Sequence, residues 1–390
     1  MRPVPVFRMA AFYFAYFAYV GVFAPYFSLY LQSVGKSALE IGLLLSVTQV
    51  MRIFAPNLWA GMADRSGARI ALLRIGLGAG ALAWCGVFVT QSFWGLFATL
   101  AFVAFFTSAA LPLFETALFS LLRDDLGRYG LLRLWGSLGF IVAVLGTGAI
   151  LDARSAQILT VLVLALLLVS FALTCSLRDG PVRSDPGAYL PLWPVVRRPE
   201  VAALLLACFL MSVAHGPFYT FYSIYLADYG YSKSLVGVLW SLGVVAEIGV
   251  FVLAPRIFLR WSLNTVLILS FACAVVRFAA IGWGVGSLAV LVVAQVLHAA
   301  TFGSYHAAAL GQINQWFPDR QRSRGQALYM SLSFGAGGMV GGAGSGLVWD
   351  SVGAAWTFTL GSLCAALGLM LLVAAAKISS REKGPRERQR

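Results

Sequence analysis

The 390-residue sequence has little charge. Asp, Glu, Lys and Arg together make up 11% of it, whereas 60% of its residues are hydrophobic. Soluble globular domains carry about 25% charged residues, so this composition excludes an ordinary soluble chain. No long polar segment that could form a soluble domain interrupts the hydrophobic runs. The sequence is therefore that of a membrane protein.

Residues that build metal and redox sites are also scarce. The three histidines have no acid or cysteine at ligand spacing, so we expect no metal. The five cysteines fall in five different hydrophobic runs, which predicts packing residues and no disulfide framework. No nucleophile–base pair or cofactor motif is present. On these grounds we do not expect an enzyme, and we expect no cofactor beyond a proton gradient.

Long hydrophobic runs fill the rest of the chain. A helix crosses a bilayer in about 20 apolar residues, and runs of this length recur from end to end. The first run lacks a signal-peptide cleavage pattern, so we expect it to be retained. We predict an all-α membrane protein with twelve transmembrane helices, at residues 8–30, 38–60, 70–90, 94–122, 130–151, 156–177, 200–226, 234–255, 263–283, 286–316, 325–349 and 354–376.

The net charge of +13 is distributed unevenly across the predicted membrane. Lys36, Arg154 and Lys233 are the basic residues in odd-numbered loops, and most of the others lie on the opposite side. Because basic residues collect on the cytoplasmic side, this asymmetry predicts that both termini are cytoplasmic. It also explains the charge without a nucleic-acid partner. We expect a multi-pass protein of a bacterial inner membrane, surrounded by lipid and monomeric.

The chain divides into two similar halves. Residues 178–199, rich in proline and arginine, predict a cytoplasmic linker between six-helix bundles at 1–177 and 200–376, followed by a basic tail at 377–390. Residues 26–53 align without a gap on residues 221–248. Parallel repeats of this kind place a substrate site between the halves and alternate access by rocking. The same register pairs Arg52 with Glu247, two charges of opposite sign.

Charged residues inside the predicted spans are the strongest functional candidates. Arg52, Glu115, Glu247 and Arg277 lie there, together with all three histidines. An ionised side chain at a helix centre costs about 2.5–3.5 kcal/mol on insertion scales, so such groups normally face a cavity or each other.

Helix ten carries a polar face. Gln295, His298, Phe302, Tyr305 and His306 share one side of it, which predicts a wet or substrate-lined surface. Either His298 or His306 could instead be a hydrogen-bonded packing residue.

Aromatic stripes run along helices one and seven. Tyr19 belongs to the first stripe and Tyr222 to the second. Such stripes more often reflect packing than ligand binding, but buried tyrosine hydroxyls need partners that an aqueous cavity supplies.

The loop after the second span has the spacing D-R-x-G-x-R, formed by Asp64, Arg65, Gly67 and Arg69. This loop resembles the cytoplasmic signature of the major facilitator superfamily, and the twelve spans, linker and repeat agree with that fold. The resemblance implies that these four residues form a cytoplasmic gate. The alternative is that the loop is only a solvated turn. The corresponding loop of the second half has no acid at the position of Asp64.

A further motif joins helices four and five. Glu115 is followed eighteen residues later by Arg133, and then by Gly136, Gly139 and Phe140. The pattern resembles the lactose permease type of proton symporter. That resemblance implies that Glu115 and Arg133 face each other and bind substrate, and that Phe140 stacks on its apolar face.

Three segments of the second half, LWSLGVVAE, CAVVRF and QVLHAATFGSYH, resemble phenylpropionate permeases of the same group. One departure matters: Thr301 stands where lactose permeases carry a proton-bearing acid. Their helix-eight glutamate would align with Val244, one turn before Glu247.

Together these features predict a proton-coupled symporter that imports a small organic solute, most plausibly an aromatic carboxylate. Glu247 is the first candidate for the proton carrier, with Arg277 or Arg52 switching towards it, and His298 is the second. Tyr19, Tyr222, Phe140, His298 and His306 are expected to line the substrate site. A sugar or nucleoside symporter, an exporter, and a membrane sensor or lipid-handling protein remain as alternatives.

Overall fold

The computed structural model describes residues 6–122, 126–179 and 191–387. Those residues form helices and connecting turns, with no strand among them. The chain separates into two compact units, residues 1–186 with 219–241, and residues 187–218 with 242–390. Residues 219–241, which we assigned to the C-terminal bundle, thus make their contacts with the first unit. Much of the predicted linker lies outside the described residues.

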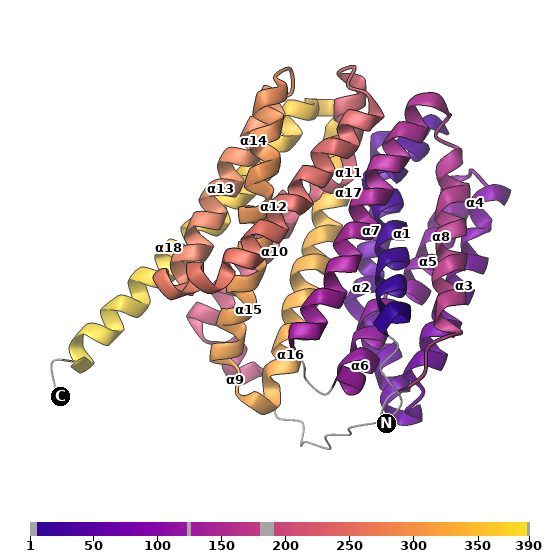
Figure 1. The fold of residues 1–390 in the computed structure, drawn as a ribbon. Coiled ribbons are helices and arrows are strands. Elements are labelled where there is room, and N and C mark those ends of the chain that lie inside the picture. Colours follow the sequence, from indigo (N-terminus) through magenta and orange to yellow (C-terminus); the bar gives the residue numbers. More distant parts are fainter. Residues whose placement is uncertain (1–5, 123–125, 180–190, 388–390) are drawn as a thin grey trace. The chain divides into compact units, whose positions relative to one another are not determined.

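The first unit is built around its N-terminal helix, which packs against α7 and α8 (Figure 1). The second helix packs against α5, and α3 packs against α5, α6 and α8. The helices that lie wholly in this unit are α1 (Val6–Ser33), α2 (Ala38–Ser66), α3 (Arg69–Trp84), α4 (Gly86–Val89), α5 (Phe93–Thr107), α6 (Ala110–Leu122), α7 (Leu126–Ala153) and α8 (Ile158–Thr174).

Two helices are shared between the units, α11 (Gly216–Asp228) and α12 (Lys233–Arg260). In the second unit, α18 packs against α10 and α13. Its other helices are α9 (Trp193–Val196), α10 (Pro199–Ala214), α13 (Leu263–Gly284), α14 (Leu288–His298), α15 (Tyr305–Trp316), α16 (Asp319–Met330), α17 (Gly338–Val352) and α18 (Ala354–Glu387).

Two short π-helical segments interrupt the α-helices of the second unit. Ala299–Ser304 joins α14 to α15, and Ser331–Gly337 joins α16 to α17. Each π-helical turn accommodates an extra residue and re-aims the side chains that follow, and such turns are frequent at functional sites. The first begins directly after His298, on the polar face predicted from the sequence.

The number of spans is only partly as predicted. Ten helical stretches within the described residues are long and apolar enough to cross a membrane. The sixth predicted span, 156–177, contains an apolar helix of 17 residues, Ile158–Thr174. The eleventh, 325–349, is divided by the π-helix Ser331–Gly337. The chain is therefore an all-helical multi-pass protein, and the full set of twelve remains a prediction.

Two glycines explain how α1 and α7 approach each other closely. A methyl group added at Gly139 would collide with the backbone carbonyl of Phe14, and one added at Gly21 would lie 2.8 Å from the carbonyl oxygen of Phe140. Small residues at such positions let helix backbones pack tightly in membranes. This contact fixes α7, and therefore Arg133, against the N-terminal helix.

We predict that Gly139→Ala lowers the melting temperature of the purified protein, because overpacking at a backbone contact costs about 1–3 kcal/mol. Gly146→Ala on the same helix is the control, since a methyl group there meets no atom within 4 Å. Both changes add the same helix propensity, so their difference isolates packing. Equal melting temperatures for the two variants would show that the packing of α1 against α7 does not depend on this contact.

Candidate functional site

The first unit brings together the predicted substrate pair. Nε of Arg133 on α7 lies 3.9 Å from Oε1 of Glu115 on α6, and both side chains are partly exposed. Two tyrosine hydroxyls donate to the same carboxylate oxygen, Tyr13 from α1 and Tyr129 from α7, each at 3.2 Å. Three helices therefore hold one carboxylate that has hydroxyl and guanidinium donors around it.

Aromatic rings hold the guanidinium of this pair. The Arg133 guanidinium carbon lies 4.3 Å from the centre of the Phe17 ring and 5.8 Å from that of Tyr13. A cation over a ring face is attracted by the ring quadrupole. A methyl group at Gly136 would lie 3.0 Å from Arg133 Nη1 and 2.8 Å from the Phe17 ring. The first glycine of the G-x-x-G pattern therefore leaves room for this stacked cation.

The three aromatic residues predicted to enclose a substrate ring all belong to the first unit. Phe140 is half-buried on α7, and Tyr19 is buried on α1 between the rings of Tyr16 and Phe23. Tyr222 is buried on α11, with its ring edge-on to Trp240. Their predicted contact with substrate stays a prediction.

The second unit contains a close acid–histidine contact. Nε2 of His298 on α14 lies 2.7 Å from Oε1 of Glu247 on α12, and the two side chains are 7% and 15% exposed. A contact this short and this shielded is a strong, charge-assisted hydrogen bond when either partner is ionised. The first and second candidates for the proton carrier are thus joined in one pair.

Arg277 lies beside this pair and is fully buried. Its Nε donates to the carbonyl oxygen of Ala294 at 2.9 Å, and its Nη1 donates to Thr301 Oγ1 at 3.3 Å. Nη1 also lies 3.5 Å from Nε2 of His215, whose Nδ1 is 2.8 Å from the carbonyl oxygen of Met211. Since Nδ1–H must be the donor in that bond, Nε2 of a neutral His215 is an acceptor for the arginine.

The third histidine lies further along the same face. Nδ1 of His306 on α15 is 2.9 Å from the hydroxyl of Tyr329. The ring of Phe302 stacks between His298 and His306, with centroids 5.5 Å and 6.3 Å from theirs. The three histidines thus have three different neighbours: His298 contacts a carboxylate, His306 a phenol and His215 a guanidinium.

The predicted gate loop lies between the end of α2 and the start of α3. Gly67 ends α2 with φ of 67°, a left-handed conformation that favours glycine, and donates its N–H to the carbonyl oxygen of Ala63. Asp64 is exposed in the last turn of α2, and Arg65 beside it is exposed, whereas Arg69 is buried at the start of α3. The gate role of these residues stays a prediction.

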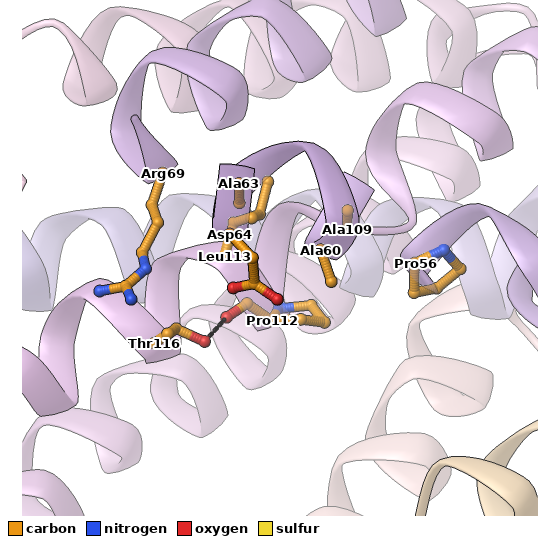
Figure 2. Close-up of a pocket in the computed structure, with 9 residues that line it drawn as sticks. All are labelled: Pro56, Ala60, Ala63, Asp64, Arg69, Ala109, Pro112, Leu113 and Thr116. Atoms are coloured by element: carbon orange, nitrogen blue, oxygen red, sulfur yellow. Dashed lines mark hydrogen bonds between the residues drawn. The ribbon is translucent and has the colours of Figure 1, made fainter. Parts of the chain in front are cut away.

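A small cavity of about 50 Å³ lies beside this loop, within the first unit (Figure 2). Asp64 and Arg69 line it together with Pro112 and Thr116 of α6, and Thr116 Oγ1 donates to the carbonyl oxygen of Pro112. The cavity therefore joins the gate loop to the same helix that carries Glu115.

A capping contact ties α7 to the start of α12 within the first unit. The Asp152 carboxylate accepts from the backbone N–H groups of Lys233 and Ser234, at 2.7 and 3.0 Å. A carboxylate at a helix N-terminus is favoured because the first N–H groups have no partner inside the helix. A methyl group at Gly148 would lie 2.6 Å from the Lys233 carbonyl oxygen, so the two helices meet closely here.

Arg52 is exposed on α2 and belongs to the first unit, whereas Glu247 belongs to the second. Their pairing stays a prediction.

Several site residues were not predicted from the sequence. Tyr13 and Phe17 lie next to the aromatic stripe predicted for α1 and are not part of it. Tyr129 stands four residues before Arg133, a spacing that places both on one helix face and could have indicated it. Thr301 was noted only for the acid it replaces, although it is a hydrogen-bond acceptor for Arg277.

The fold and the buried charges within it define a membrane transporter. The chain belongs to the MFS_1 like family of the major facilitator superfamily, whose sequence profile matches residues 6–360.

Relatives of known name support this. The chain is 33% identical to a probable 3-phenylpropionic acid transporter of Escherichia coli (strain K12), over 83% of this chain and 86% of that protein. It is 26% identical to a maltose permease of Geobacillus stearothermophilus, over 94% of this chain and 93% of that protein. A crystal structure of the nucleoside transporter NupG has the same fold, with a TM-score of 0.84 at 17% identity, over 96% of this chain and 99% of that one.

We predict that Arg277→Lys lowers the melting temperature, because an ammonium group cannot reproduce the planar fork that contacts Ala294, Thr301 and His215. Loss of such bonds to a buried charge costs roughly 2–3 kcal/mol. Arg260→Lys, at the exposed end of α12, is the control and should change stability little. A wild-type melting temperature for Arg277→Lys would contradict the structural importance of these bonds.

Proposed function

We propose that this protein is a proton-coupled symporter that imports a small aromatic carboxylate by rocking between two access states. It works as a monomer in a bacterial inner membrane, with both termini in the cytoplasm and no cofactor other than the proton gradient. The observation that carries the proposal is the shielded contact between Glu247 and His298. An ionised acid inside a membrane helix is costly, and acids found there usually mark a substrate, ion or proton pathway.

The proton step takes place at this pair. When Glu247 binds a proton, its carboxylate loses its charge and the hydrogen bond from His298 weakens. When Glu247 releases that proton, the bond reforms. Because the Cγ of Glu247 is 3.7 Å from the position of a methyl group on Gly303, the pair lies against the π-helix, where a change in one bond can shift the following helix. Proton binding would thus alter α15, the helix that follows the π-helix and carries His306.

The solute's carboxylate would bind at Arg133. This guanidinium is 38% exposed and uses Nε towards Glu115, which leaves further donors for an anion. Phe17 and Tyr13 already hold it in position, so little side-chain entropy is lost on binding. The similarity to a probable 3-phenylpropionic acid transporter supports an aromatic acid as the solute. Phe140, Tyr19 and Tyr222 would enclose the ring.

Two alternative functions, a sugar or nucleoside symporter and an exporter, also have support. The Glu115 carboxylate can accept hydrogen bonds from solute hydroxyls, and the Tyr13, Tyr129 and Arg133 groups around it can donate to them. A sugar or nucleoside symporter therefore fits the same site. The similarity to a maltose permease points the same way. An exporter also fits, because rocking is reversible.

We predict that Arg133→Ala weakens binding of 3-phenylpropionic acid roughly tenfold to hundredfold, since a hydrogen-bonded charge pair is lost. The measurement is a thermal-shift screen of purified protein against aromatic acids, sugars and nucleosides. Arg128→Ala, five residues earlier on α7, is the control and should bind as the wild type does. Stabilisation by carboxylates that survives Arg133→Ala would reject the anion site.

We also predict that Glu247→Gln abolishes accumulation of labelled 3-phenylpropionic acid in proteoliposomes with an inward proton gradient, but keeps exchange between labelled and unlabelled solute. The amide fills the same volume and cannot cycle a proton. Glu200→Gln at the start of α10 should accumulate normally. Accumulation by Glu247→Gln against a gradient, with loss in His298→Gln, would transfer the proton to His298.

A further inference from the structure

Gln295 lies on α14 one turn before His298, and its side chain is fully buried. Neither its Oε1 nor its Nε2 has a hydrogen-bond partner among the described residues. Leaving a buried polar group unpaired is costly, so native structures pair nearly all of them. An unpaired donor and an unpaired acceptor on one side chain indicate a site that something else completes.

Two neighbours of Gln295 shape this site. Gly243 on α12 lies opposite, because a methyl group there would be 3.3 Å from Gln295 Oε1 and 3.2 Å from Cδ2 of His298. The backbone of α12 therefore lies close to the amide and to the histidine ring at this point. Nδ1 of His298, the ring nitrogen that does not face Glu247, is also buried without a partner among the described residues. Three unpaired polar atoms therefore share one face of α14 beside a glycine.

We propose that Gln295 is a specificity-determining residue that hydrogen-bonds a neutral donor–acceptor group of the solute, namely a hydroxyl, at a site formed with Gly243 and His298. This inference rests on the proposed transport function and refines its substrate class. A carboxylate would leave Oε1 unpaired and stand close to the Glu247 charge. An ammonium would leave Nε2 unpaired. A hydroxyl donates one bond and accepts others, so it satisfies both ends of the amide.

For an aromatic acid, this group is a hydroxyl on the ring, and for a nucleoside it is a hydroxyl on the ribose. Sites built to hydrogen-bond a hydroxyl discriminate strongly against analogues that lack it, because their own buried groups are then left unpaired. The protein should therefore prefer hydroxylated aromatic acids over 3-phenylpropionic acid itself.

The test is calorimetric titration of the purified full-length protein with 3-phenylpropionic acid and its 3-hydroxyphenyl and 4-hydroxyphenyl analogues. Wild type should bind at least one hydroxylated acid about tenfold more tightly than the parent acid. Gln295→Met keeps the volume and removes the amide. It should reduce this ratio to about one while leaving the affinity for the parent acid nearly unchanged.

The control is Gln321→Met, the same change at another buried glutamine of the second unit, whose Nε2 donates to the Pro191 carbonyl oxygen. It should keep the wild-type ratio. An equal ratio in wild type and Gln295→Met would overturn the proposal, because water or packing would then satisfy the amide. Loss of both acids in Gln295→Met would overturn it too, since binding of the parent acid reports an intact site.

A second arm separates this proposal from the proposed function. Uridine and 2′,3′-dideoxyuridine are titrated in the same way. If no aromatic acid binds but uridine is preferred over its dideoxy analogue, and Gln295→Met abolishes that preference, the hydroxyl site stands and the aromatic-acid function fails. If neither class shows a preference that depends on Gln295, the inference fails.

Discussion

The need to pair charges inside a bilayer organises this protein. Each unit places an acid and a base where hydrocarbon would make an isolated ion costly. In the first unit, Glu115 accepts hydrogen bonds from two tyrosine hydroxyls and lies 3.9 Å from Arg133. In the second, Glu247 contacts His298 at 2.7 Å. The remaining features, from the close packing of α1 on α7 to the π-helix after His298, serve to bring these partners from separate helices into contact.

The two units solve this problem with different chemistry. Arg133 is stacked on Phe17 and partly exposed, and its Nε lies 3.9 Å from Glu115 Oε1. Arg277 is fully buried and bonded to a backbone carbonyl and Thr301. Both units thus hold an acid–base pair, but the pair in the first unit is partly exposed and the pair in the second is shielded.

Sequence reasoning predicted the membrane class and the charged residues inside the helices, because hydropathy and charge are properties of single residues. Proximity of Glu115 to Arg133 followed from a family resemblance. The tyrosine partners of Glu115 were not predicted. Tyr13 lies next to the aromatic stripe of α1 but does not share its regular spacing. The π-helix at Ala299–Ser304 could not be predicted, because an i to i+5 bond leaves no residue pattern. Gln295 appeared only as one polar residue on a face, since the absence of a partner is visible only after packing.

Solute-driven proton movement in proteoliposomes tests the central claim most directly. An internal pH dye is followed after 3-phenylpropionic acid is added outside, with the membrane potential clamped at zero. Protein-free liposomes are subtracted, because the neutral acid crosses bilayers and acidifies the interior by itself. The account predicts a further acidification with wild type that is absent with Glu247→Gln. Uptake of labelled solute by wild type with no acidification beyond the protein-free control would contradict it.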